Sequence, residues 1–200
     1  MFLNVSGKKC VVVGGGEVAE RKSLLLNKSG AAVTVVASVI TALLEEMKTK
    51  GAISVINRDF RSGDLKGVAI AIAATDNRAV NMLVAIEGRA GGTLVNVVDD
   101  AKNSDFILPS IVRRGDVTIA ISTSGRSPAL ARKLRLEIEK HLGEEVDSLA
   151  VLLSEVRDEL RQQGKKVDGD EWQKCLDLAA LTTGIREGKY AETKKELISL

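Results

Sequence analysis

Aromatic side chains are scarce in this 200-residue chain and make up only 2% of it. So few rings exclude the aromatic platforms on which many proteins stack the bases of single-stranded nucleic acid, and no nucleic-acid partner is expected. Any core must instead be aliphatic. Hydrophobic residues at 44% and charged residues at 28% are ordinary for a globular protein. The length suits one full domain with a smaller companion.

Cysteine and histidine are equally rare, with two residues of the first and one of the second. Cys10 and Cys175 are far apart and match no metal-ligand spacing, so no metal site is expected. Cys10 begins an apolar run and is predicted to be a small buried side chain. His141 falls late in a predicted helix, where a C-terminal position favours its charged form.

Long apolar runs are absent as well. No stretch approaches the roughly 20 residues that cross a bilayer, and no signal peptide precedes the first predicted strand. The net charge of +2 points to no class of partner, because lysine and arginine are spread along the chain. We therefore expect a cytoplasmic protein with no membrane partner.

Short β-branched runs alternate with amphipathic helices through the first hundred residues. This alternation predicts a doubly wound parallel sheet with helices on both faces, a Rossmann-type α/β domain. The expected strands are 10–13, 32–37, 53–57, 68–73 and 93–98, and the expected helices are 17–29, 39–50 and 77–90.

The pattern changes after Asp100. Strands are predicted over 106–108 and 117–121, with a turn at Arg113-Arg-Gly115 between them. Ser127 suits a helix N-cap and Pro128 the first helical position, so a helix is expected to begin there. Its inward residues are predicted to be Leu130, Leu134 and Ile138.

From about residue 144 the sequence predicts only helices, broken at Gly164, Gly169 and Gly184. The chain is thus expected to have three parts. These are a nucleotide-binding Rossmann domain at 1–104, a small α+β dimerisation region at 105–143 and a helical C-terminal domain at 144–200.

The first predicted strand ends in Gly14-Gly-Gly16-Glu-Val-Ala19, which fits the pattern G-x-G-x-x-A. Gly14 would permit the tight turn, Gly16 would let a pyrophosphate approach the backbone, and Ala19 would let the helix pack closely on the strand. The start of the following helix would offer free N–H groups to the phosphates. A glycine-rich turn without a ligand is the simpler alternative.

One expected feature is missing from this motif. The acidic residue that usually binds the adenosine ribose is absent from the end of the second strand, which reads Val36-Ala37-Ser38. Ribose contacts would then come from Ser38 or from backbone groups. No basic residue stands there to receive a 2′-phosphate, which favours NAD over NADP.

Four stretches in series resemble the precorrin-2 dehydrogenases, the NAD-dependent part of siroheme synthases, over about residues 8–140. They are Gly14–Lys22, Ala71–Asp76, Asn96–Asp99 with Phe106–Ser110, and Ile119–Pro128. The resemblance implies a Rossmann domain, a central dimerisation region and a small helical domain, with the active site between two subunits of a homodimer. It also implies oxidation of precorrin-2 to sirohydrochlorin with NAD, for siroheme biosynthesis. Some relatives also insert ferrous iron into the product.

The resemblance places the critical active-site carboxylate at Asp99, in the stretch Asn96-Val-Val-Asp99. This position lies at the carboxyl end of the fifth predicted strand, where open α/β sheets bind ligands, and a carboxylate there is a reasonable proton acceptor. A simple loop-capping role for Asp99 is the alternative. The expected cofactor-binding residues are Gly14, Gly16, Glu17, Val18, Ser38, Val39, Thr75 and Asp76. Asp76 could equally be only a helix cap.

Residues further along the chain are expected to bind the tetrapyrrole. Ser124 belongs to a hydroxyl-rich loop that resembles the substrate-side loop of the family. Precorrin-2 carries several carboxylates, and arginine binds carboxylates through two parallel hydrogen bonds. Arg113, Arg114 and Arg126 are therefore substrate-binding candidates, although any one of them could simply be a solvated surface residue.

Two other functions remain open at this point. A non-catalytic NAD-binding module that senses redox state would explain the glycine turn, but not Asp99 or the stretch 119–128. An oxidoreductase of a small metabolite would need a catalytic histidine, lysine or tyrosine in a recognisable arrangement, which the sequence does not show. Whether the chain also uses ferrous iron as a substrate stays open, and Asp99 could serve both reactions.

Overall fold

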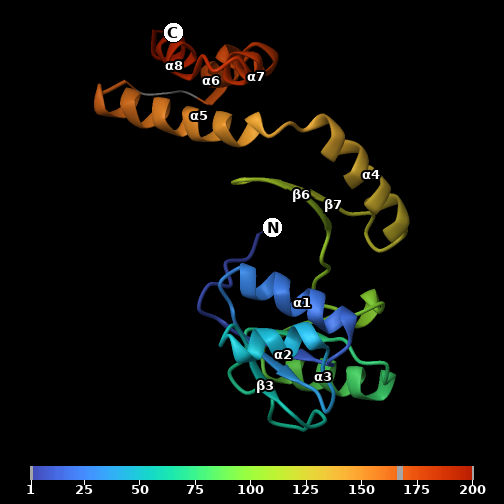
Figure 1. Cartoon of the computed structure of the whole chain (residues 1–200). Coiled ribbons are helices and arrows are strands. Elements are labelled where there is room, and N and C mark those ends of the chain that lie inside the picture. The colour runs from blue at the N-terminus through green and yellow to red at the C-terminus, as the bar shows by residue number, and fades with distance from the viewer. Residues whose placement is uncertain (1, 166–168, 200) are drawn as a thin grey trace. The chain divides into compact units, whose positions relative to one another are not determined.

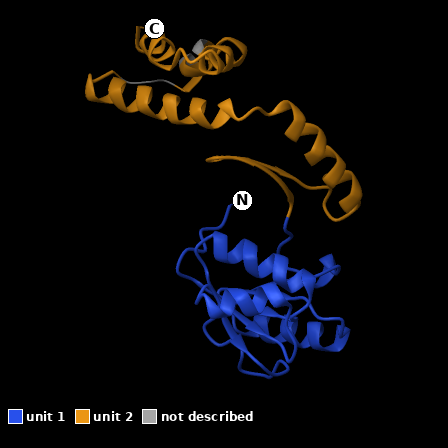
Figure 2. Cartoon of the chain, in the orientation of Figure 1, with its two compact units in different colours: residues 1–108 blue, residues 109–200 orange. Residues whose placement is uncertain are grey.

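The structure, a computed structural model, describes residues 2–165 and 169–199, apart from the side chains of Glu171 and Cys175. It divides into two compact units, residues 1–108 and residues 109–200 (Figure 2). The finer division into three parts, with boundaries after residues 104 and 143, stays a prediction.

Unit 1, blue to green in Figure 1, is built on a parallel sheet. The strand order is β3-β2-β1-β4-β5. This is the order of a Rossmann domain, so the predicted α/β class is confirmed. The strands are β1 (Lys9–Val13), β2 (Ala32–Val36), β3 (Ser54–Ile56), β4 (Ile70–Ala73) and β5 (Leu94–Val97). The helices between them are α1 (Glu17–Lys28), α2 (Ala42–Thr49) and α3 (Arg78–Ala90).

Alternate residues of each strand pack on opposite faces of this sheet. Cys10 and Val12 of β1 belong to the cluster that contains α1 and α2, whereas Val11 and Val13 belong to the cluster that contains α3. Burial on both faces explains why the strands read as continuous aliphatic runs. Cys10 is 1% exposed, as predicted for a small buried side chain, and burial raises the pKa of its thiol.

The second helix is shorter than its sequence suggests. The hydroxyl of Thr41 accepts a hydrogen bond from the Leu44 N–H at 3.4 Å and caps α2, which begins at Ala42 rather than near residue 39. Residues 38–41 are consequently a loop, and this loop reaches the site described below.

Unit 2 begins with the antiparallel strands β6 (Ser110–Arg114) and β7 (Val117–Ile121). The predicted strand at 106–108 is wrong. These residues end unit 1, and Pro109 follows them. Phe106 and Leu108 pack against the core of unit 1 and pair with no strand, and the Asn96 side-chain amide donates to the Phe106 carbonyl at 2.9 Å. The turn falls at Gly115, whose φ is +52°, so Arg113 and Arg114 are strand residues.

Helix α4 (Pro128–His141) begins as predicted, because the Ser127 hydroxyl accepts a hydrogen bond from the Leu130 N–H at 3.2 Å. His141 is its last residue, as expected. The predicted inward face is wrong for two of its three residues. Leu130 is 50% exposed and Leu134 is 42% exposed, while Ala131 is the buried residue of this helix.

The remaining helices pack around a second aliphatic core. Gly164 follows the first of them, as predicted, but Gly184 lies inside a helix, where the absence of a side chain lets it approach Thr193 closely. The prediction that Gly184 breaks a helix is therefore wrong. The helices are α5 (Glu145–Gln162), α6 (Gly169–Cys175), α7 (Leu178–Arg186) and α8 (Tyr190–Ser199). Within the described part of the chain, no helix is long and apolar enough to span a membrane.

Candidate functional site

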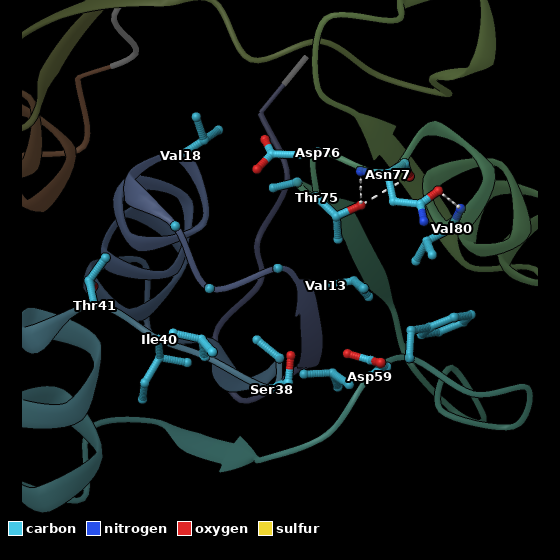
Figure 3. A pocket seen from close by; sticks show the side chains of 18 of the residues that line it. Val13, Val18, Ser38, Ile40, Thr41, Asp59, Thr75, Asp76, Asn77 and Val80 are labelled. Carbon is cyan, nitrogen blue, oxygen red and sulfur yellow. Dashed lines mark hydrogen bonds between the residues drawn. The ribbon is translucent and has the colours of Figure 1, made fainter.

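A cleft of about 700 Å³ opens at the carboxyl ends of β1, β2 and β4 in unit 1 (Figure 3). Strand β1 pairs with β2 on one side and with β4 on the other, so the strand order reverses here. Such a switch point is where open α/β sheets bind ligands, and the volume suits a small-molecule site.

The glycine loop that follows β1 is tied to the neighbouring strand ends by backbone contacts. The Gly14 N–H donates to the Val36 carbonyl at 3.0 Å, and the Gly15 carbonyl accepts from the Thr41 N–H at 3.0 Å. A β-carbon on Gly14, whose φ is +121°, would overlap the Ala74 carbonyl, and one on Gly15 would overlap the Val39 carbonyl. Side chains at these two positions would therefore push the strand ends apart.

Gly16 faces open space, and it precedes the start of α1. A β-carbon there would meet nothing within 4 Å. Gly16 is the N-cap of α1, and no described side chain caps this helix, in contrast to α2 and α3. The first N–H groups of α1 are thus left for a ligand, and such groups with an open approach suit a phosphate.

All eight residues predicted to bind the cofactor line this one cleft, which brings together three separate stretches of the chain. They are Gly14, Gly16, Glu17, Val18, Ser38, Val39, Thr75 and Asp76. A site with a glycine cradle, an uncapped helix and this volume fits a dinucleotide. The contacts of each individual residue stay a prediction.

The turn after β4 shows which of its residues are structural. The side chain of Asn77 accepts hydrogen bonds from the Ala79 and Val80 N–H groups and caps α3. The Thr75 hydroxyl donates to the Asn81 side-chain oxygen at 2.7 Å. The alternative that Asp76 caps this helix is therefore wrong, and its carboxylate borders the cleft instead.

Several residues of the cleft were not predicted from the sequence, because their position depends on tertiary contacts between loops. Gly15 looked like a free position of the motif, yet the contact with Val39 requires a glycine. Asp59 and Phe60 reach the cleft from the loop after β3. The lining residues that were missed are Val13, Gly15, Val36, Ala37, Ile40, Thr41, Asp59, Phe60, Ala74, Asn77 and Val80.

A second cavity of about 370 Å³ lies beside the end of β5 and contains Asp99. Asp76 lines both this cavity and the larger cleft. Asp99 has a φ of +59°, in the left-handed region that a non-glycine residue rarely adopts. Its carboxylate makes no hydrogen bond or ion pair with the residues that the structure describes.

The neighbouring Asp100 performs the capping role instead. Its carboxylate accepts from the Asn103 N–H at 3.2 Å and from the Asn103 side-chain amide at 2.7 Å, and so caps the short helix η1 (Ala101–Asn103). The hydrogen bond from the Asn103 side chain is the main cause that lowers the pKa of Asp100. The alternative role considered for Asp99 thus belongs to Asp100.

Lys22 of α1 lies within electrostatic range of Asp99. Burial is the main cause that lowers the pKa of the half-buried Lys22 ammonium, and the charge of Arg21 adds to this effect. The carboxylate of Asp99 acts in the opposite direction and favours the charged ammonium. Asp99 therefore has a cation in its surroundings.

The four predicted substrate-binding residues all lie in unit 2. Ser124 has a φ of +52°, and its N–H donates to the Ser122 hydroxyl at 3.1 Å. Arg113 and Arg126 are exposed. Arg114 is already engaged, since its guanidinium donates to the carbonyls of Leu142 and Glu139 at 3.1 and 3.2 Å. Arg114 thus braces β6 against α4, which leaves Arg113 and Arg126 as the freer candidates.

Among the described side chains, no group of three or more histidine, cysteine, aspartate or glutamate residues is placed to hold a metal ion.

Comparison with known proteins finds that the chain is similar to siroheme synthases. Its residues 1–110 match a family described as "Putative NAD(P)-binding", and residues 114–141 match the central region of sirohaem biosynthesis proteins. The chain is 44% identical to a siroheme synthase of Methylococcus capsulatus over 99% of its own length, which is 42% of that relative. It is 41% identical to siroheme synthase 2 of Yersinia enterocolitica over 100% of its length and 43% of the relative.

The chain thus spans less than half of the length of these relatives. A solved structure named "SirC, precorrin-2 dehydrogenase" covers 98% of this chain, with 98% of that structure matched, a TM-score of 0.79 and 26% identity. The glycine motif predicted a nicotinamide dinucleotide as the cofactor class. This is confirmed, since the match to the NAD(P)-binding family covers the whole of unit 1. The chain therefore belongs to the NAD(P)-binding family, and the central region of sirohaem biosynthesis proteins follows that domain directly.

Proposed function

We propose that this chain oxidises precorrin-2 to sirohydrochlorin with NAD as the hydride acceptor. The observation that carries the proposal is the pair of adjoining cavities in unit 1. One fits a dinucleotide and the other holds Asp99, and Asp76 borders both. The names of the siroheme synthase relatives and of the similar dehydrogenase structure support the choice of substrate.

The reaction removes two hydrogens from the reduced tetrapyrrole, one as a hydride and one as a proton. A bound nicotinamide supplies the acceptor for the hydride. Asp99 accepts the proton on a carboxylate oxygen, which no described hydrogen bond already occupies. The half-buried Lys22 of α1 is a cation within electrostatic range of this carboxylate.

The backbone around the cleft supports a position for the cofactor pyrophosphate beside Gly16. Gly14 and Gly15 hold the turn against the ends of β2 and β4, while Gly16 and the first N–H groups of α1 are open to the pyrophosphate. Absence of a basic residue beside Ser38 supports NAD over NADP. Substrate carboxylates would be bound by Arg113 and Arg126 of unit 2, with Ser124 in the same loop region, in a homodimer.

Anaerobic conversion of precorrin-2 with NAD, followed by absorbance, tests this function. Asp99→Asn is the informative variant, because asparagine tolerates the left-handed backbone that Asp99 adopts but cannot take up the proton. We expect NAD-dependent formation of sirohydrochlorin by the wild type and a loss of about 100-fold or more in the variant.

Asp100→Asn is the matched control, since its amide oxygen can still cap η1, and it should keep most of the activity. Wild-type protein that binds NAD but leaves precorrin-2 untouched would contradict the enzyme and favour a redox-sensing module. Addition of ferrous ion to the same product solution then tests for metal insertion as a second activity.

A further inference from the structure

The cleft is lined by a carboxylate that follows the third strand, whereas the end of the second strand carries no acid. Asp59 follows β3, and its side chain lines the cleft together with Ser38. Figure 3 shows both side chains at the end of the cleft away from Val18 and Asp76.

Backbone contacts explain why Ser38 and Asp59 line the same cleft. Strands β2 and β3 are parallel neighbours, with Val36 paired to Ile56. The Ala37 N–H donates to the Ile56 carbonyl at 3.2 Å, which ties the two strand ends together. Residues that follow the two strands therefore emerge at the same edge of the sheet, although Asp59 is 21 positions beyond Ser38.

The loop that carries Asp59 is held by a separate ion pair. The Arg58 guanidinium donates to both carboxylate oxygens of Asp64, at 2.8 and 2.7 Å, and to the Asp59 carbonyl at 3.0 Å. These hydrogen bonds hold the backbone of Asp59 in place. They also neutralise the Arg58 guanidinium, which would therefore attract an incoming phosphate only weakly.

The Asp59 carboxylate itself is exposed, and within the described residues it has no hydrogen bond or ion pair. A carboxylate that lines the same cleft as the Ser38 hydroxyl can accept hydrogen bonds from ribose hydroxyl groups. The same charge repels a phosphate on the ribose 2′ position. We propose that Asp59 binds the adenosine ribose and selects NAD over NADP, a role that rests on the proposed use of this cleft for the dinucleotide.

Titration calorimetry with NAD, NADP and 2′-deoxy-NAD tests the assignment without any turnover. In the wild type we expect NAD to bind at least about tenfold more tightly than either analogue. In Asp59→Ala the affinity for NAD should fall by about tenfold, and NAD and 2′-deoxy-NAD should then bind almost equally. The discrimination against NADP should shrink in parallel.

Asp76→Asn is the matched control, because it removes a carboxylate from the other end of the same cleft. It should change the affinities for NAD and NADP by the same factor. If Asp59→Ala still discriminates between the two cofactors as the wild type does, the assignment of Asp59 is overturned while the proposed function stands. If the wild type binds neither cofactor, the proposed function itself fails.

Discussion

Gly15 and Gly16 are neighbours in the same loop, yet a methyl group would act on them in opposite ways. In Gly16→Ala the new carbon points into open space, so the unfolding free energy should stay near that of the wild type. The carbon would occupy the approach of the pyrophosphate, and the affinity for NAD should fall by about tenfold or more. Titration calorimetry measures the NAD affinity, and urea unfolding of the same preparation measures the unfolding free energy.

Gly15→Ala gives the contrasting result, because its carbon overlaps the Val39 carbonyl and the protein should lose stability as well as binding. Loss of stability in Gly16→Ala, or full NAD affinity, would contradict this account of the loop.

Asp64 makes stability depend on pH in a predictable direction. The hydrogen bonds from Arg58 hold the pKa of Asp64 below its usual range, so the charged carboxylate is favoured in the folded state. Its contribution is present above the unfolded value near 3.8 and is lost as the pH falls through the lower folded value.

Asp64→Asn should therefore have a lower urea midpoint than the wild type at pH 7, and the gap should close as the pH falls below about 4. An equal gap at pH 7 and pH 3 would mean that the variant acts through packing rather than through the ion pair.

Two parts of the candidate site could be proposed from local rules. The glycine turn and the serine after the second strand lie at strand ends, where α/β sheets bind ligands. Asp99 lies at such a strand end too, but it was selected by the resemblance to the precorrin-2 dehydrogenases. Asp59, Phe60 and Thr41 could not be found this way. Each reaches the cleft through a loop whose path depends on tertiary contacts, such as the bond between Ala37 and Ile56.

At the scale of single elements, helix α3 contacts the sheet through a glycine. A β-carbon on Gly88 would overlap a methyl group of Val95 in β5, which is fully buried. Gly88→Ala should cost about 1–3 kcal/mol of unfolding free energy, because an overpacked core must shift the helix or the strand. Equilibrium urea unfolding measures the change.

Gly91→Ala is the matched control for this contact. Gly91 follows the same helix with a φ of −92°, and its added carbon would make only ordinary contacts beyond 3.4 Å. It should change stability by less than about 0.5 kcal/mol. If both variants lose stability equally, the tight approach of α3 to β5 is not the cause.

The elements of unit 1 were predictable because burial on both faces gives aliphatic runs of strand length between amphipathic helices. The wrong predictions concern segments whose apolar spacing does not match the burial or pairing seen in the structure. Phe106 and Leu108 of the apolar run 106–108 pack against the core of unit 1 without strand pairing. Leu130 and Leu134 of α4 are exposed, although their spacing is that of a buried helical face. The spacing of apolar residues alone does not predict which surface will cover an apolar face.

At the scale of the whole molecule, the two units have separate cores. The single tryptophan, Trp172, packs against the core of unit 2, whereas the cleft belongs to unit 1. A ligand stabilises only the unit that binds it. NAD should therefore raise the unfolding midpoint measured by circular dichroism for unit 1 and leave the tryptophan fluorescence transition unchanged. A single transition that shifts in both signals would show that the units unfold together.

Unit 2 carries features that favour association. Its two-stranded sheet has unpaired outer edges among the described strands, and α4 exposes Leu130, Leu134 and Leu136 at 50%, 42% and 41%. We predict a homodimer with twice the chain mass of 21.3 kDa. Sedimentation equilibrium at micromolar concentration checks this, and a monomer over the whole concentration range would contradict it.

At Asp99, the left-handed backbone makes the residue best for folding stability differ from the residue proposed for proton transfer. Glycine would adopt the same φ at no steric cost, so Asp99→Gly should make the folded protein more stable by about 1 kcal/mol. The same change would remove the carboxylate on which turnover is proposed to depend. A screen for heat resistance alone would then enrich chains without a carboxylate at residue 99, and only a screen that also demands the proposed turnover would retain the aspartate.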